Sequence, residues 1–222
     1  MTDRLIKYLS QFITEERNKL FDTVLSERTR YIKVVLEDIY QPHNASAVLR
    51  TMDCFGIQDA CIIENMNEYH VNPDVALGSS KWLTLEKFNK KENNTLEAIE
   101  NLKKENYRIV ATTPHTFDTK LDDFDLKKGK AALFFGTEMH GLSKVVLENA
   151  DDFVKIPMYG FTESFNISVS AAIILYHLTE KLKKLQDHWQ LSENERKEIK
   201  LEWLKRSIKR SDLLIDNFLS HE

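Results

Sequence analysis

Apolar residues occur along this chain in short continuous runs that are rich in β-branched and aromatic side chains. Such a run is typical of a strand that is buried on both faces, and the stretches between the runs have the spacing of helices. Strands that alternate with helices predict a parallel sheet covered by helices on both faces, which is an α/β fold. The runs lie at residues 31–36, 57–63, 107–112, 131–135 and 152–156.

Helical spacing of apolar residues covers most of the remaining chain. The pattern predicts one helix over residues 3–27. A second helix is expected to begin at Asn44, because asparagine is a favourable N-cap residue, and to end at Gly56. Further helices are expected at residues 94–105, 167–185 and 192–218.

One folded α/β domain with helical appendages accounts for the whole length. The chain has 222 residues, of which 42% are hydrophobic and 30% charged, with only 6 glycines and 4 prolines. This composition fits a folded protein and argues against disorder or a solenoid. We expect an N-terminal helical arm at 1–30, the main domain at 31–180 and a C-terminal helical arm at 181–222.

Neither a membrane segment nor a metal site is expected. No stretch approaches the ~18 apolar residues that span a bilayer, and the N-terminus has no signal-peptide core, so we expect a cytoplasmic protein. Cys54 and Cys61 stand without a second cysteine pair or suitably spaced histidines. Two reduced, packed thiols are therefore the expectation.

Charge is distributed unevenly along the chain. The net charge is −4, with residues 1–30 and residues 180–222 at +1 each and the residues between them at −6. A net negative charge ordinarily argues against a nucleic-acid partner, but residues 203–210 carry four basic side chains and no acidic one. This basic segment fits either a focused nucleic-acid contact or a solvated helix face.

Several common classes of enzyme are disfavoured by missing motifs. The sequence contains neither G-x-G-x-x-G nor G-x-x-x-x-G-K-[ST], the loops that hold phosphates in dinucleotide-binding domains and P-loop NTPases. G-x-S-x-G is also absent, and Ser164 has no histidine nearby to act as its base. We therefore do not expect a nucleotide hydrolase or a serine hydrolase.

Three polar and glycine-containing clusters each follow a predicted strand, where ligand sites of open α/β sheets gather. Taken singly, each has a structural explanation: a helix cap with an exposed arginine, an ordinary turn, and a tightly packed helix. Taken together and in this order they indicate an active site. The clusters are Pro-His-Asn at 42–44 with Arg50, Phe-Gly-Thr-Glu at 135–138 with Gly141, and Ser-Phe-Asn at 164–166.

With these three clusters, residues 31–180 resemble the SpoU branch of the SPOUT RNA methyltransferases, and within it the TrmH-type tRNA guanosine 2′-O-methyltransferases. The segment Gly-Ser-Ser-Lys-Trp at 78–82 and the two helical arms are similar to that group as well. The resemblance implies a parallel sheet with a C-terminal deep trefoil knot, one of the exceptions to the rule against threaded chains.

The resemblance also implies a site for S-adenosyl-L-methionine within the knot. Its adenine would be held by backbone groups and apolar side chains, and the residues implicated by position are Thr112, Gly136, Ile156, Met158 and Phe165. The catalytic residues implied are Arg50, Asn44, Glu138, Ser164 and Asn166. Because an arginine keeps its proton, we expect Arg50 to grip the adjacent phosphate and align the ribose hydroxyl. No metal is needed in this scheme.

The expected substrate is tRNA, specifically the D-loop guanosine at tRNA position 18, and the expected assembly is a homodimer formed through the knot. Helix 167–185 is a candidate dimer element, although a monomer core would show the same pattern. A ribosomal RNA 2′-O-methyltransferase of the same superfamily and a non-catalytic RNA-binding protein of the same fold are the alternatives. The RNA-binding candidates are Arg28 and Arg30 in the first arm and Trp203, Lys205, Arg206, Lys209 and Arg210 in the second.

Overall fold

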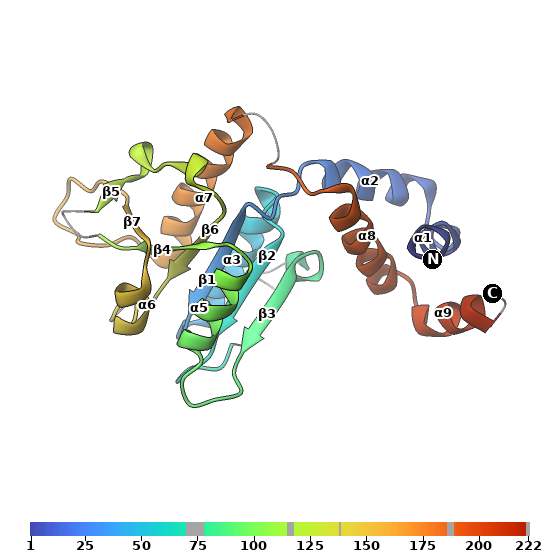
Figure 1. The fold of residues 1–222 in the computed structure, drawn as a ribbon, viewed down its shortest axis with the longest axis horizontal. Helices are drawn as coiled ribbons and strands as arrows, with labels where there is room; N and C mark the ends of the chain where they lie inside the picture. The colour runs from blue at the N-terminus through green and yellow to red at the C-terminus, as the bar shows by residue number, and fades with distance from the viewer. Residues whose placement is uncertain (70–77, 115–117, 138, 186–188, 221–222) are drawn as a thin grey trace. The chain divides into compact units, whose positions relative to one another are not determined.

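The computed structural model describes the chain except for residues 70–77, 115–117, 138, 186–188 and 221–222. Two compact units make up the described chain. One consists of Met1–Thr29 together with Gln190–Glu222, and the other of Arg30–Trp189. The first unit is helical and the second contains the sheet (Figure 1).

The second unit is built on a parallel sheet of seven strands within the described residues, in the order β3-β2-β1-β6-β4-β7-β5. β6 lies between β1 and β4, with Ile32 opposite Ala131 and Arg108 also opposite Ala131. The α/β fold predicted from the apolar runs is therefore confirmed. The strands are β1 (Ile32–Glu37), β2 (Asp59–Ile63), β3 (Thr84–Phe88), β4 (Arg108–Thr112), β5 (Thr119–Lys120), β6 (Ala131–Phe135) and β7 (Asp152–Lys155).

The two outermost strands, β3 and β5, were not predicted from the sequence. β3 has the composition Thr-Leu-Glu-Lys-Phe and is buried only at its last residue, while both residues of β5 are exposed. Strands at the edge of a sheet lack the continuous apolar character of the inner strands, because they are covered on fewer sides. The apolar-run pattern therefore detects only the inner strands.

Helices cover both faces of the sheet (Figure 1). Side chains alternate along β1, so Val34 and Leu36 pack with helices α3 (Pro42–Cys54) and α7 (Ile167–Lys184). Val35 packs on the opposite face with α5 (Thr95–Lys104) and α6 (Lys144–Asn149). Each fully buried aliphatic or aromatic side chain contributes about 1.5–3 kcal/mol to such a core. Short 3-10 helices lie at η1 (Ser79–Lys81), η2 (Leu121–Asp123) and η3 (Leu126–Lys128).

The helical unit is built from residues at both ends of the chain. Trp203 is fully buried in this unit. The centroid of its ring lies 5.4 Å from that of the Phe21 ring and 5.4 Å from the guanidinium carbon of Arg28. None of the described helices is long and apolar enough to cross a membrane. The helices are α1 (Thr2–Ser10), α2 (Glu15–Ser26), α8 (Glu193–Ser207) and α9 (Ser211–Ser220).

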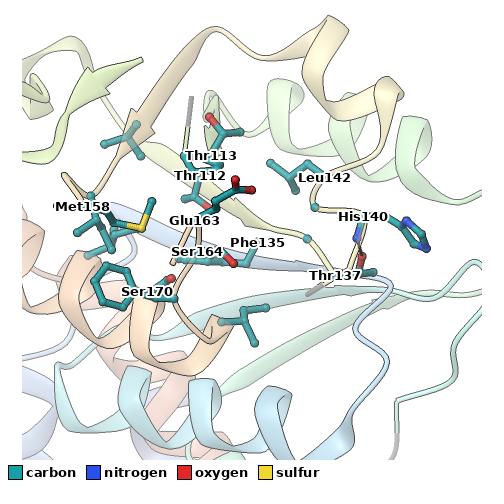
Figure 2. A pocket seen from close by; sticks show the side chains of 18 of the residues that line it. Thr112, Thr113, Phe135, Thr137, His140, Leu142, Met158, Glu163, Ser164 and Ser170 are labelled. Atoms are coloured by element: carbon teal, nitrogen blue, oxygen red, sulfur yellow. Dashed lines mark hydrogen bonds between the residues drawn. The ribbon is translucent and has the colours of Figure 1, made fainter. Parts of the chain in front are cut away.

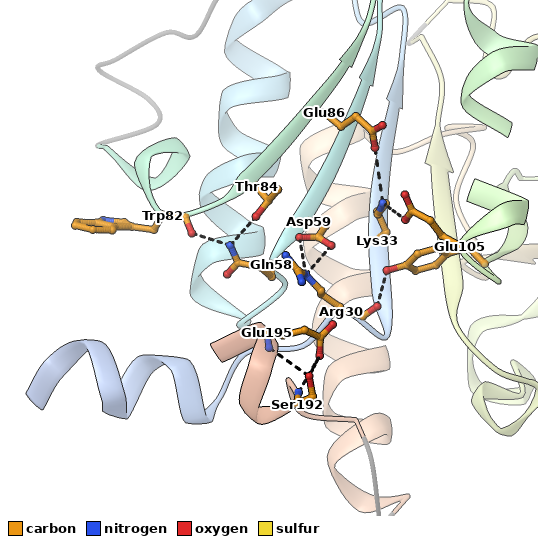
Figure 3. Close-up of polar contacts among 11 residues, drawn as sticks. Arg30, Lys33, Gln58, Asp59, Trp82, Thr84, Glu86, Glu105, Ser192 and Glu195 are labelled. Atoms are coloured by element: carbon orange, nitrogen blue, oxygen red, sulfur yellow. Dashed lines mark hydrogen bonds and ion pairs between the residues drawn. The ribbon is translucent and has the colours of Figure 1, made fainter. Parts of the chain in front are cut away.

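The prediction of one helix over 3–27 is wrong, because the helix is interrupted between α1 and α2. The Thr14 side chain accepts a hydrogen bond from the Arg17 amide and so starts a new helix, a capping signal that the apolar spacing concealed. The long C-terminal helix is divided as well, at Arg210, whose φ is 59°. At the start of α8, Ser192 and Glu195 form the reciprocal hydrogen bonds of a capping box (Figure 3).

Candidate functional site

A cavity of about 360 Å³ lies at the carboxyl ends of the neighbouring strands β6, β4 and β7 and at the start of α7 (Figure 2). Open α/β sheets bind their ligands at this end of the strands. Leu142, Val154, Ile156 and Ile174 give part of the wall an apolar surface. The volume lies in the range of about 300–1,000 Å³ that is usual for small-molecule sites.

The turn after β6 brings two pieces of backbone into very close approach. A Cβ at Gly136 would lie 2.2 Å from the carbonyl carbon and oxygen of Gly141 and 2.4 Å from the Leu142 nitrogen. Thr137 and Gly141 exchange two backbone hydrogen bonds of 2.9 and 3.0 Å, and Gly141 has a φ of +66°. Glycine is therefore required at 136 for space and is favoured at 141 for conformation.

The end of β4 forms a second wall of the cavity. The Thr112 hydroxyl donates a hydrogen bond of 2.7 Å to the Phe134 carbonyl, and the Thr113 amide donates to the Val154 carbonyl at 3.1 Å. These bonds tie β4 to both of its neighbours, β6 and β7. The cavity wall is therefore fixed by the sheet itself.

The segment between β7 and α7 closes the cavity. Met158, Glu163, Ser164 and Phe165 all contribute to its lining. Asn166 caps α7, because its Oδ1 accepts hydrogen bonds from the Ser168 amide at 2.9 Å and the Ser168 hydroxyl at 2.6 Å. The five residues expected from sequence to bind the cofactor all line this one cavity, together with Ser164. They are Thr112, Gly136, Ile156, Met158 and Phe165.

Asn44 is not the N-cap of its helix, as the sequence had suggested. Gln41 occupies that position, and Asn44 lies buried in the first turn of α3. Its Oδ1 accepts a hydrogen bond of 3.2 Å from Nδ2 of Asn166. The side chain therefore joins the first cluster of the sequence to the third, across more than a hundred residues.

Among the expected catalytic residues that the structure describes, Ser164 lines the cavity, whereas Asn44, Arg50 and Asn166 do not. Arg50 lies exposed on α3 and is not among the residues that line the cavity. Its guanidinium makes no hydrogen bond or ion pair with the residues the structure describes. Glu138 lies outside the described residues, although Thr137 and His140 on either side of it line the cavity.

Sequence reasoning did not identify Glu37 as part of this region. Its buried carboxylate accepts hydrogen bonds from the Ser143 amide at 2.9 Å, the Ser143 hydroxyl at 2.6 Å and the Thr95 hydroxyl at 2.8 Å. It thus ties the end of β1 to the segment that follows Gly141. The signal available in the sequence was an acidic residue directly after the apolar run at 31–36.

A second buried carboxylate, Glu64, organises the loop after β2. It accepts hydrogen bonds from the Lys87 ammonium at 2.9 Å, the Asn89 amide at 2.9 Å and the Tyr69 backbone amide at 3.0 Å. Burial tends to raise the pKa of Glu64, but these three donors outweigh it and hold the pKa below its usual value. The carboxylate is therefore a stabilising anion at neutral pH.

The expected RNA-binding residues differ in what their side chains do. Arg28 is buried over Trp203, and Arg30 forms an ion pair of 3.1 Å with Asp59 (Figure 3). Burial raises the pKa of Asp59, and the positive charge of Arg30 opposes that effect. Lys205 pairs with Glu202 at 2.7 Å. The exposed side chains of this set are Arg206, Lys209 and Arg210.

Among the described residues, no group of three or more His, Cys, Asp or Glu side chains is placed to hold a metal ion. Cys61 is buried, which raises the pKa of its thiol, whereas Cys54 is exposed, so the expectation of a packed thiol is wrong for Cys54.

Comparison with known proteins relates the chain to RNA methyltransferases. Residues 31–176 match the SpoU rRNA Methylase family. Over 212 residues the chain is 43% identical to a tRNA (guanosine(18)-2′-O)-methyltransferase of Borreliella burgdorferi, covering 94% of this chain and 95% of that protein.

Two solved structures are similar to this fold. The TrmH/SpoU tRNA modifying enzyme of A. aeolicus aligns with a TM-score of 0.77 and 29% identity, over 88% of this chain and 98% of that one. The SpoU methyltransferase AviRb from Streptomyces viridochromogenes, solved in complex with the cofactor AdoMet, aligns with a TM-score of 0.58 and 19% identity. That alignment covers 74% of this chain and 62% of AviRb, and it concerns the fold alone.

Proposed function

This chain belongs to the SpoU methylase family, and from that premise we propose that it is an S-adenosyl-L-methionine-dependent tRNA methyltransferase. It transfers a methyl group to the 2′-oxygen of guanosine 18 in the D-loop. The observation that carries the proposal is the convergence of all five expected cofactor residues on one cavity of about 360 Å³. The similarity to a guanosine-18 enzyme over 94% of the chain supports the choice of substrate.

The residues present fit the cofactor. The close approach of Gly136 to Gly141 leaves no room for a side chain at residue 136, and both glycines line the cavity. Ile156, Met158 and Phe165 offer apolar contacts for a flat adenine ring. S-adenosyl-L-methionine supplies an electrophilic methyl group when it is bound.

Methyl transfer also requires that the ribose hydroxyl is aligned and loses its proton. The Arg50 guanidinium can hold the phosphate next to the ribose in a bidentate manner. Asn44 and Asn166, joined by their hydrogen bond, orient Ser164 and the adjoining end of the cavity. Positioning of this kind can supply about 7–11 kcal/mol of the barrier in favourable cases, so a strong base is not essential.

A homodimer explains how Arg50 reaches the reaction. We infer that Arg50 of one subunit completes the cavity of its partner, since the arginine is exposed and does not line the cavity of its own chain. The surface of α7 and the segment before it is unusually apolar for exposed residues. Phe165 is 42% exposed, Val169 44% and Tyr176 58%. Burial of these side chains would favour association at this surface.

The path of the chain supports a trefoil knot in the cavity region. β6 lies between β1 and β4, and β7 lies between β4 and β5. Each connection from β4 to β7 in chain order therefore passes over at least one intervening strand. The close approach of residues 136 and 141–142 then brings the β6 turn against itself beside the start of α7. We propose that the segment from the end of β4 to α7 forms the knot of the family, with this turn beside the cavity.

Contact with tRNA falls to the helical unit. Arg206, Lys209 and Arg210 are exposed around the junction of α8 and α9. Basic side chains there would bind the phosphate backbone in a salt-dependent way. Because Arg28 and Arg30 are engaged within the protein, they contribute less than their sequence position suggested.

A methyl-transfer assay tests the proposed function. Purified protein and radiolabelled S-adenosyl-L-methionine are incubated with a tRNA transcript carrying guanosine 18, with the same transcript already 2′-O-methylated at that position, and with ribosomal RNA. We expect label only in the first RNA. Equal labelling of both transcripts would overturn the choice of position, and labelling of ribosomal RNA alone would overturn the choice of tRNA.

A further inference from the structure

One acidic side chain of the cavity lining, that of Glu163, has no role in the proposed reaction. Among the described residues that line the cavity, Glu163 carries a formal charge at neutral pH, while the others are apolar, hydroxyl-bearing or glycine apart from His140. Glu163 directly precedes the expected catalytic Ser164. Figure 2 shows its side chain among those of Thr112, Thr113 and Ser164.

The charge of Glu163 is not balanced within this part of the protein. Its carboxylate makes no hydrogen bond or ion pair with any residue that the structure describes. The rest of the described lining offers mainly hydroxyls and apolar groups such as Met158 and Phe165. A carboxylate placed against such a surface is more favourable when a cation lies beside it.

The proposed cofactor offers such a cation. S-adenosyl-L-methionine carries a sulfonium, an α-ammonium and an α-carboxylate group at its methionine end, which therefore has a net charge of +1, while its adenine end is neutral. We propose that the carboxylate of Glu163 is the anionic contact for the cationic methionine end of the cofactor. This inference rests on the proposed function and adds a residue to the same site.

Position in the cavity agrees with this assignment. The apolar contacts suited to adenine come from Ile156, Met158 and Phe165, and the carboxylate adds the one anionic group described in the lining. Glu163 is exposed, so it lies where the cavity meets solvent. Solvent screens a charge in such a place, so the expected effect on binding is about five- to tenfold.

Calorimetric titration with three ligands tests the proposal. The ligands are S-adenosyl-L-methionine, which has both the sulfonium and the ammonium, S-adenosyl-L-homocysteine, which keeps the ammonium and the carboxylate but lacks the sulfonium, and 5′-methylthioadenosine, which has none of these charged groups. The variant is Glu163→Gln, which keeps the shape and removes the charge. Glu148→Gln is the matched control, because Glu148 is an exposed acid paired with Lys144 and outside the cavity lining.

We expect Glu163→Gln to weaken binding of S-adenosyl-L-methionine about five- to tenfold and to leave 5′-methylthioadenosine unchanged. An equal loss for S-adenosyl-L-homocysteine assigns the contact to the ammonium, and no loss assigns it to the sulfonium. The difference between wild type and variant should shrink as salt is raised.

Three results would overturn the inference. They are a variant that binds S-adenosyl-L-methionine as wild type does, a loss of the same size for 5′-methylthioadenosine, and a similar loss in the Glu148→Gln control. Failure of the wild-type protein to bind all three ligands would instead refute the proposed function. The two failures are therefore distinguishable.

Discussion

Replacing Gly136 with alanine is a direct test of the close backbone approach that shapes the cavity. The added Cβ would lie 2.2 Å from the carbonyl group of Gly141, and backbone cannot move aside as a flexible side chain can. Overpacking of this kind costs about 1–3 kcal/mol. Loss of the two hydrogen bonds between Thr137 and Gly141 would add about 0.5–1.5 kcal/mol each, so we expect the free energy of unfolding to fall by about 2–6 kcal/mol.

Thermal unfolding and calorimetric binding of S-adenosyl-L-homocysteine measure the outcome. For a chain of this size 1 kcal/mol shifts Tm by about 2–4 °C, so the Gly136→Ala variant should melt roughly 4–24 °C lower and lose most of its affinity for S-adenosyl-L-homocysteine. Gly160→Ala is the matched control, because a Cβ at Gly160 meets nothing within 4 Å and Gly160 does not line the cavity. A Gly136→Ala variant that melts and binds like Gly160→Ala would refute the steric reasoning.

Three further substitutions test other parts of the site. Asn166→Ala removes the cap of α7 and should lower the free energy of unfolding by about 1 kcal/mol or more in a denaturant titration, whereas Asn166→Asp keeps the oxygen that caps, loses only the bond to Asn44 and should cost less. Arg50→Lys should lower the turnover number about 100-fold with unchanged cofactor affinity, since lysine cannot bind a phosphate in a bidentate manner; retention of most of the turnover would contradict this role. Because the pKa of Glu64 lies below its usual value, its carboxylate stabilises the fold above its ordinary pKa of about 4.3, and this stability is lost as pH falls through the folded value. Glu64→Gln should therefore reduce the loss of stability in acid, as measured by denaturant titrations from neutral to acidic pH, and an unchanged acid dependence would count against it.

The inner part of the fold could be predicted from the sequence because burial on both faces leaves a clear trace. β1 and β6 are buried at every residue, and both were found as continuous apolar runs. β3 and β5 were missed because edge strands carry polar residues. The helix prediction over 3–27 failed where one local hydrogen bond, from the Arg17 amide to Thr14, outweighed the apolar spacing.

The cavity could be predicted only in part. Residues directly after strands, such as Thr112 and Gly136, were found because the ends of parallel strands meet at one edge of a sheet. Asn44 was assigned to a helix cap because its partner, Asn166, is distant in sequence. Glu37 and Glu163 were missed because the role of a single carboxylate depends on which groups the folded chain brings to it.

The strand order has a consequence for synthesis of the protein. β1, β2 and β3 can pair as soon as residue 88 has emerged from the ribosome, but β1 also needs β6, whose first residue is Ala131. Until then the inner edge of β1 presents unpaired amide and carbonyl groups to any other nascent chain. The later half of the polypeptide must therefore fill a gap in the middle of the sheet, which slows folding and makes truncated products prone to aggregate.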